Sequence, residues 1–291
     1  MTIGPPLLIG ALLALLAATA LGVAGALTRA PLAARTATAA GPSIPADGRP
    51  TAGLLRLAHL GLLLAFGLLL TAMLARTVAA GHAPWSNLHE VTQAFGAFLL
   101  ASYLVAERRV PIRPLAPLVA LLAAGLVAVA LQLPDDVVPL APALQSPLLL
   151  TVHVGAAIVA YAVSGLAFAA AVGEIAQARA GDRIALLPPA ATCRALAYRC
   201  VLVAFPILTA AIALGSVWAN MAWRSYWNND PKELAAAGTW LLYAAYLHVA
   251  GRGDRAGRAA PWLLVAGFGA VLFTFLGASL VFPGQHSYAG V

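Results

Sequence analysis

The chain has 291 residues, of which 62% are hydrophobic and only 9% are charged, a balance that excludes an ordinary soluble domain of this length. A net charge of +7 is compatible with nucleic-acid binding, but the basic residues gather in short patches between apolar runs. That distribution is typical of a protein embedded in a lipid bilayer, so we expect no nucleic-acid partner.

Eight apolar runs follow one another along the chain. Each is close to the roughly 17 to 25 residues that a helix needs to cross the hydrocarbon of a bilayer. Because backbone groups in lipid must be hydrogen-bonded within the protein, we predict an all-α bundle of about eight transmembrane helices, forming a single membrane domain over residues 1–291. The first run lacks a preceding basic residue, so we interpret it as a span rather than a signal peptide. The runs cover residues 5–28, 53–75, 88–106, 115–133, 148–172, 195–217, 234–250 and 262–282.

Basic residues divide the connecting loops into two groups. Fourteen of the 17 follow the first, third, fifth and seventh runs, and the positive-inside rule places those loops in the cytoplasm. Both termini and the remaining loops are then extracytoplasmic, where the sequence has only Arg76, Arg224 and Lys232. The cytoplasmic residues are Arg29, Arg35, Arg49, Arg56, Arg108, Arg109, Arg113, Arg179, Arg183, Arg194, Arg199, Arg252, Arg255 and Arg258.

The most distinctive segment is the extracytoplasmic loop between the sixth and seventh runs, residues 217–233. It contains three of the six tryptophans of the chain, and the sequence Asp230-Pro-Lys-Glu233 follows them. An aromatic belt at the membrane interface is one explanation of the tryptophans. A belt needs no particular order of residues, however, and it does not explain the acidic motif.

This loop resembles the tryptophan-rich WWD signature of the CcsA/ResC family of cytochrome c biogenesis proteins. The resemblance runs from about residue 84 to residue 291 and is strongest from residue 195 onward, whereas the first two spans are supported by hydropathy alone. The matching segments are Asn87–Glu90, Val152–Val154, Tyr161, Val217–Glu233, Thr239–Trp240, Tyr243, Tyr246–His248, Leu276–Gly277 and His286–Tyr288.

The resemblance implies a haem-delivering subunit of the cytochrome c synthase machinery in the bacterial plasma membrane. Such a protein presents haem b on the outer face for covalent attachment to apocytochrome c, beside a ResB/CcsB-like membrane partner. His153 and His286 match the two axial ligands of the iron, and His248 matches a histidine that contacts haem on its way from the cytoplasm. The attacking thiols belong to the apocytochrome, so we expect no catalytic residue in this chain, and its status as part of a haem lyase stays open.

Haem is a flat apolar macrocycle with two carboxylates at one edge and an iron that accepts imidazole. The loop offers two cations, Arg224 and Lys232, that would pair with the carboxylates. For Asp230 two interpretations are open, a direct haem contact or the N-cap of the seventh span, with Pro231 at the first helical position. The aromatic residues expected to cover the macrocycle are Trp218, Trp223, Tyr226 and Trp227.

Two positions depart from the family pattern. The residue before the aspartate is usually tryptophan and is Asn229 here, and the residue after the first loop tryptophan is usually glycine and is Arg224 here. One stacking surface is therefore lost, which removes roughly 1 to 3 kcal/mol of aromatic contact. Arg224 offsets part of this loss if it binds a haem carboxylate.

Other residues whose side chains could bind a metal or take part in a reaction have simpler interpretations. His89 and His82 lie on or near the loop before the third span, and His89 is a spare ligand candidate. The pair His89-Glu90 does not indicate a zinc protease, because the second histidine of that motif is replaced by Gln93. We interpret His59 as a core histidine, with a second haem contact as the alternative. Two thiols alone make no metal site, so we interpret Cys193 and Cys200 as packing residues, with a redox role or a transient haem contact as the alternative.

Two other functions compete with cytochrome c synthesis. A haem exporter or haem-binding chaperone without ligation activity would use the same outer loop and histidines. A regulator of tetrapyrrole synthesis acting through protein contacts is the third hypothesis, but it leaves the tryptophan-rich loop and His286 unexplained.

Overall fold

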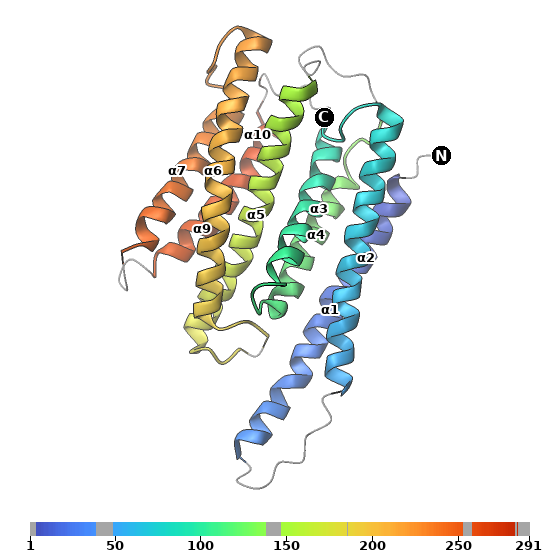
Figure 1. The fold of residues 1–291 in the computed structure, drawn as a ribbon, viewed down its shortest axis with the longest axis vertical. Coiled ribbons are helices and arrows are strands. Elements are labelled where there is room, and N and C mark those ends of the chain that lie inside the picture. Colours follow the sequence, from blue (N-terminus) through green and yellow to red (C-terminus); the bar gives the residue numbers. More distant parts are fainter. Residues whose placement is uncertain are drawn as a thin grey trace.

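The computed structural model describes residues 4–38, 49–137, 147–184, 186–252, 258–282 and 284, and the regular structure in these ranges is helical (Figure 1). Eight long helices follow one another, which confirms the all-α prediction. They are α1 (Gly4–Thr38), α2 (Arg49–Ala80), α3 (Leu88–Ala106), α4 (Ala116–Ala130), α5 (Pro147–Ala180), α6 (Ala190–Trp223), α7 (Pro231–Ala250) and α9 (Ala260–Leu272). A 3₁₀ turn, η1 (Arg113–Leu115), precedes α4, and a π-helical turn, η3 (Phe273–Gly277), leads from α9 into α10 (Ala278–Leu280).

Six of these helices are long and apolar enough to cross a membrane, as far as the described residues go. The chain is thus a multi-pass membrane protein. We also expected α3 and α7 to be spans, but each opens with polar side chains that lower its hydropathy, including Glu90 in α3 and Lys232 in α7. The six candidate spans are Gly4–Thr28, Gly53–Ala80, Arg113–Ala130, Thr151–Ala180, Ala190–Trp223 and Ala260–Gly277.

The helices of the bundle lie in two groups, α1 to α4 on one side and α5, α6, α7 and α9 on the other (Figure 1). The long pair α1 and α2 forms one edge and packs on α4, α3 packs between α4 and α5, and α6, α7 and α9 form the other edge. Helix α5 contacts α3 on one side and α6 and α9 on the other, so it joins the two groups of helices. Fully buried side chains concentrate where α3, α4 and α5 meet, for example Leu99, Val127 and Ala160.

Small residues allow the close helix contacts of this bundle. At Gly165 in α5, an added Cβ would come within 3.2 Å of Leu99 in α3 and of Phe268 in α9. Three helices therefore meet around a position that has no room for a side chain. Such contacts are usual in membrane bundles, because lipid offers no hydrophobic drive for helices to associate and close packing replaces it.

Helix α6 is longer than the apolar run that predicted it. It continues to Trp223, so Trp218 and Trp223, which we expected in a loop, are helical, and the irregular connection to α7 begins at Arg224. The expected loop 217–233 is therefore part helix, part connection and part first turn of α7. The helical extension gives Trp218 a fixed position on the end of α6.

His59 and the two cysteines lie outside the cavity region. His59 Nδ1 lies 2.9 Å from Glu107 Oε1, so this partly exposed histidine is paired across α2 and the end of α3. Cys193 and Cys200 are free thiols and are both buried, as expected of packing residues.

Candidate functional site

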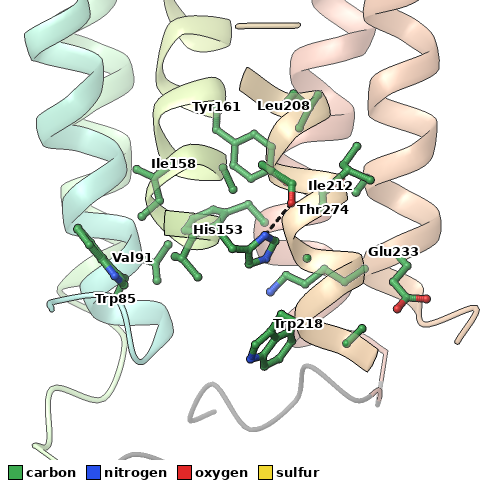
Figure 2. A pocket seen from close by; sticks show the side chains of 18 of the residues that line it. Trp85, Val91, His153, Ile158, Tyr161, Leu208, Ile212, Trp218, Glu233 and Thr274 are labelled. Carbon is green, nitrogen blue, oxygen red and sulfur yellow. Dashed lines mark hydrogen bonds between the residues drawn. The ribbon is translucent and has the colours of Figure 1, made fainter. Parts of the chain in front are cut away.

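A cavity of about 200 Å³ lies at one end of the bundle (Figure 2). One wall comes from residues 85–88 and the first turn of α3, and the other from the start of α5 and the last turns of α6. The connection from α6 to α7, the first two turns of α7, and Thr274 and Phe275 of η3 complete the lining, and Tyr161 lies deeper in the bundle. Five of the predicted site residues line this cavity, namely His153, Trp218, Tyr226, Trp227 and Lys232.

His153 is held in one orientation by its neighbours on α6. Its Nδ1–H donates to the carbonyl oxygen of Ala211 at 2.8 Å, which assigns the lone pair to Nε2. The imidazole lies nearly parallel to the indole of Trp218, with 6.3 Å between ring centroids and 10° between planes. It also lies over Gly215, where an added Cβ would be 2.5 Å from Cε1 of the imidazole. Histidine ligates metals as a neutral imidazole, and a hydrogen bond at one ring nitrogen orients the ring so that the other nitrogen can bind the metal.

The tryptophans and the tyrosine form an aromatic surface whose members range from buried to exposed. Trp218 is buried and packs edge-to-face against Trp223, with 4.7 Å between centroids. Tyr226 and Trp227 are 60% and 43% exposed, so their rings are open to a ligand or a partner protein. The connection is tied back to α6 by Ser216, whose hydroxyl donates to the carbonyl of Tyr226 at 2.9 Å.

Asp230 caps helix α7. Its carboxylate accepts from the backbone N–H of Lys232 at 2.9 Å, and Glu233 accepts from the N–H groups of Asn228 and Asp230 at 2.7 and 3.2 Å. These bonds form a reciprocal capping box. Asp230 is buried and is not among the described residues lining the cavity, so the geometry favours the cap over a direct ligand contact.

Lys232 lines the cavity from the first turn of α7. Burial lowers the pKa of its ammonium group to about 8, and the negative charge of Asp230 opposes this effect. A cation that is poorly hydrated in this way gains when an anionic group is placed beside it. Lys232 is therefore a suitable partner for a carboxylate of a bound ligand.

The two other predicted histidines are not seen in the cavity. His248 is exposed in the last turn of α7, 16 positions after Lys232 and so about 24 Å along the helix from the cavity. His286 lies outside the described residues. Gly284 is described, and an added Cβ there would lie 2.5 Å from Oδ2 of Asp230, so the chain two positions before His286 runs against the capped start of α7.

Comparisons with known proteins agree on one family. The family model described as Cytochrome C assembly protein matches residues 62–286. The chain is 35% identical over 278 residues to the cytochrome c biogenesis protein CcsA of Synechococcus sp. (strain CC9902), covering 84% of this chain and 89% of that protein. It is 34% identical over 283 residues to CcsA of Synechocystis sp. (strain ATCC 27184), covering 76% and 84%. The chain belongs to the CcsA family of cytochrome c assembly proteins.

A solved structure supports the fold of this CcsA-type chain. The cytochrome c haem lyase CcmF superposes with a TM-score of 0.67 over 95% of the chain, at 23% sequence identity. The chain spans about half the length of that protein, 47% of it. Membership in the CcsA family implies haem handling, and the fixed imidazole of His153, the aromatic surface and the Lys232 cation together fit a porphyrin.

The two departures from the CcsA pattern share a backbone feature. Arg224 ends α6 with φ at +61°, and Asn229 has φ at +54°, so both lie in the left-handed region. Asparagine tolerates this region better than most residues, and its side-chain oxygen accepts from Trp227 Nε1 at 2.9 Å. Arg224 has no such tolerance and is exposed at the edge of the site.

The wall formed by residues 85–88 was not predicted as part of the site. Trp85 and Val91 line the cavity on the side away from Trp218 (Figure 2). The one signal was the match of Asn87–Glu90 to the family pattern, without a role attached. Of the other candidates nearby, His82 Nδ1 bonds to Ala83 O at 3.0 Å and His89 Nδ1 to Ala130 O at 2.7 Å, and neither is a described lining residue.

Proposed function

We propose that this protein binds haem b in the cavity beside His153 and presents it to apocytochrome c, as the membrane subunit of a cytochrome c synthase. The observation that carries the proposal is the single orientation of His153, fixed by Ala211 and Gly215 inside a cavity with aromatic and cationic lining. When bound, haem supplies an iron that accepts imidazole and vinyl groups to which cysteine thiols add.

In this proposal the residues of the chain position the porphyrin rather than react with it. His153 would ligate the iron through Nε2, and His286 would supply the second imidazole. Trp218, Trp223, Tyr226 and Trp227 cover the macrocycle, and Lys232 and Arg224 pair with its carboxylates. Asp230 keeps the start of α7 in place through its capping box. His248, near the other end of α7, would contact haem if haem reaches the cavity from the cytoplasm.

The orientation of the bundle is also part of the proposal. In this proposal the cavity end of the bundle, with both termini, lies on the extracytoplasmic face of a bacterial plasma membrane, and the clustering of basic residues supports that orientation. Helices α3 and α7 then cross the membrane together with the six more apolar helices. A ResB/CcsB-like membrane protein completes the machine, and apocytochrome c approaches the exposed rings of Tyr226 and Trp227.

The proposal is tested by haem spectra and by a covalent reporter. We expect His153→Ala to shift the Soret band of the purified protein and to weaken haem binding by about tenfold or more, because the imidazole that would hold the iron is removed. His82→Ala, which changes a loop histidine outside the described lining, should leave the spectrum unchanged. Unchanged spectra in both His153→Ala and His286→Ala would reject these ligands.

A haem chaperone or exporter without ligation activity is the second candidate. The departures at Arg224 and Asn229 favour it, because they alter the part of the site nearest the usual tryptophan signature. Co-expression with the partner and a reporter carrying Cys-x-x-Cys-His separates the two functions. Covalent haem on the reporter supports the synthase, whereas bound haem without covalent product supports the chaperone.

A further inference from the structure

One wall of the cavity is held by charged residues that do not themselves line it. Residues 81–87 connect α2 to α3; Trp85, Ser86 and Asn87 of this connection line the cavity together with Leu88, the first residue of α3. Short connections in membrane proteins are often mobile, because few contacts restrain them. Here the connection is tied to three helices, so its position is restrained by the structure around it.

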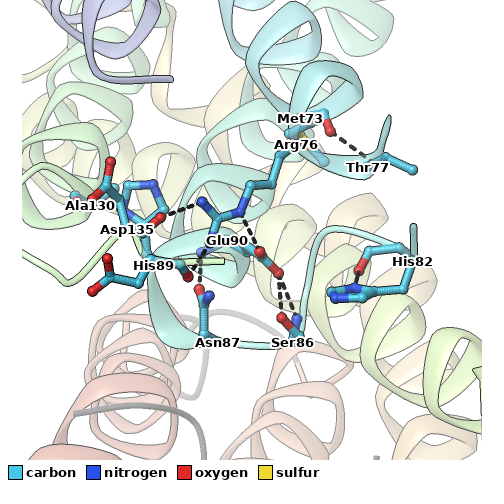
Figure 3. Close-up of polar contacts among 12 residues, drawn as sticks. Met73, Arg76, Thr77, His82, Ser86, Asn87, His89, Glu90, Ala130 and Asp135 are labelled. Atoms are coloured by element: carbon cyan, nitrogen blue, oxygen red, sulfur yellow. Dashed lines mark hydrogen bonds and ion pairs between the residues drawn. The ribbon is translucent and has the colours of Figure 1, made fainter. Parts of the chain in front are cut away.

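Glu90, in the first turn of α3, is the centre of these ties (Figure 3). Its side chain is 1% exposed, and Arg76 Nε at the end of α2 donates to Oε1 at 2.6 Å. Its other oxygen, Oε2, accepts from both the backbone N–H and the hydroxyl of Ser86 at 2.8 Å. One buried carboxylate thus joins the end of α2 to a residue of the cavity wall.

The rest of the Arg76 guanidinium reaches a third segment. Its two terminal nitrogens donate to the carbonyl oxygens of Asp135 and Asp136, which follow α4 (Figure 3). Two neighbouring residues add further ties. Asn87 accepts from the N–H of Glu90 at 2.9 Å as the N-cap of α3, and His89 donates to Ala130 O, the last residue of α4.

The energetics of this network indicate a geometric role. A buried ion pair contributes little net stability compared with apolar side chains of the same size, because desolvation offsets the attraction. Its donors and acceptors are directional, however, and they define one arrangement of the groups that they join. The arrangement defined here is that of Ser86 and Asn87, across the cavity from the stack of His153 on Trp218.

We propose that Glu90 and Arg76 are positioning residues for the bound haem, acting through residues 85–88. The inference rests on the proposed function, since it takes haem as the ligand of the cavity. The pair holds this wall at a fixed separation from His153, so that the porphyrin is clamped between the two walls. Neither residue touches the ligand.

The test compares Glu90→Gln with a matched variant at the far end of the bundle. Glu174 in α5 accepts from Arg194 Nε at 2.7 Å, its side chain is 5% exposed, and neither residue is a described lining residue. We expect Glu90→Gln to weaken haem binding by about tenfold and to shift the Soret band, as loss of a supporting partner of a cofactor site typically does. Glu174→Gln should leave both unchanged.

A measurement without haem checks the same inference. Hydrogen exchange in the haem-free protein should become faster at residues 85–91 in Glu90→Gln, with no change at the start of α5 or the end of α6. Arg76→Gln should reproduce both effects, and the double variant Arg76→Gln/Glu90→Gln should be no worse than either single one, because the two residues act as one unit.

The possible outcomes separate this inference from the proposed function. If the unaltered protein binds haem and Glu90→Gln binds it with the same affinity and spectrum, the inference fails and the proposed function stands. Equal losses in Glu90→Gln and Glu174→Gln would also overturn it, because they would show general weakening of the bundle. If the unaltered protein binds no haem, the proposed function fails, while local exchange at residues 85–91 still reports whether Glu90 holds the wall.

Discussion

Arg224 occupies a backbone conformation in which glycine alone avoids a close contact between Cβ and the carbonyl oxygen. The family usually has glycine there, so the arginine adds strain to the end of α6. A strained residue that lies at the edge of a binding site is often retained for its side chain. In the proposed function that side chain is a cation for a haem carboxylate.

If Arg224 adds backbone strain but binds a haem carboxylate, replacing it with glycine should raise stability and lower haem affinity. Arg224→Gly should raise the free energy of unfolding in detergent by about 1 kcal/mol, because the left-handed conformation then costs little. The same change should weaken haem binding by about threefold, the size expected for an exposed ion pair. Denaturant titration and haem titration measure the two quantities.

Two further variants separate strain from charge at this position. Arg224→Lys keeps the cation and the strain, so we expect stability and haem affinity close to those of the unaltered protein. Arg224→Asn removes the cation and relieves part of the strain, so it should resemble Arg224→Gly. A loss of stability in Arg224→Gly would show that the arginine makes contacts that outweigh its backbone cost.

Single residues differ in how far their roles were predictable. The cap at Asp230 was one of two interpretations, because Asp-Pro-x-Glu is a local signal for a helix start and the capping bonds span only three residues. The wall at Trp85 was not predictable in the same way. Trp85 lines the same cavity as His153 although the two are 68 positions apart in the chain, and no local spacing encodes that arrangement.

At the scale of elements, the site depends on the packing of α5 against α6. His153 in α5 reaches Ala211 and Gly215 in α6, one helical turn apart, and Trp218 follows less than a turn later. One face of α6 therefore supplies a hydrogen-bond acceptor, a flat contact and a stacking partner for the imidazole. The orientation of His153 is a property of the helix pair.

A methyl group placed between the two helices should disrupt this arrangement. Gly215→Ala would place Cβ 2.5 Å from Cε1 of His153, so the imidazole must move away from Ala211. We expect haem binding to fall by about tenfold or more while helical content stays the same, because alanine is a better helix former than glycine. Gly125→Ala, in α4 with no atom within 4 Å of the added Cβ, is the control and should bind haem normally. Normal binding in Gly215→Ala would show that the close contact does not orient His153.

The ends of the helices show why hydropathy predicts elements only in part. The predicted span 148–172 corresponds to α5, which continues to Ala180 through Glu174, Gln177 and Arg179. Hydropathy shows which part of a helix can lie in lipid. The helix itself ends where the backbone hydrogen bonds between successive turns end. In the same way, the sixth apolar run ends at residue 217, so we predicted Trp218 in a loop, whereas the helix α6 continues past it to Trp223.

At the scale of the whole molecule, the cavity lies between two groups of helices. The loop before α3 belongs to the group α1–α4, and His153, Trp218 and Lys232 belong to the group that begins at α5. The apolar runs predicted the helices, and the charge patches divided the loops between the two sides of the membrane. The packing of α3 against α5, by contrast, depends on how side chains fit together, and the sequence pattern does not predict it. The sequence-derived orientation of the whole bundle remains a prediction.

Single-cysteine labelling in intact cells tests that orientation. Both native thiols, Cys193 and Cys200, are buried, so replacing them with alanine gives a background without reactive cysteines at small packing cost. We expect a membrane-impermeant maleimide to label Ser225→Cys and His82→Cys from outside, because both positions lie in connections at the cavity end. Arg108→Cys and Arg252→Cys should be labelled only after permeabilisation, because the basic loops are retained in the cytoplasm.

The labelling pattern tests the orientation of the bundle and also whether the cavity can serve the proposed function. A cytochrome c precursor receives haem outside the cytoplasm, so the function proposed here requires the connection at Ser225 and the loop at His82 to share the outer side. Labelling of Ser225→Cys and Arg252→Cys from the same side would mean that α7 does not cross the membrane, and the charge-based topology would be wrong. Labelling of Ser225→Cys only after permeabilisation would place the cavity in the cytoplasm. Haem binding by His153 could then persist, but delivery to an apocytochrome from this cavity could not.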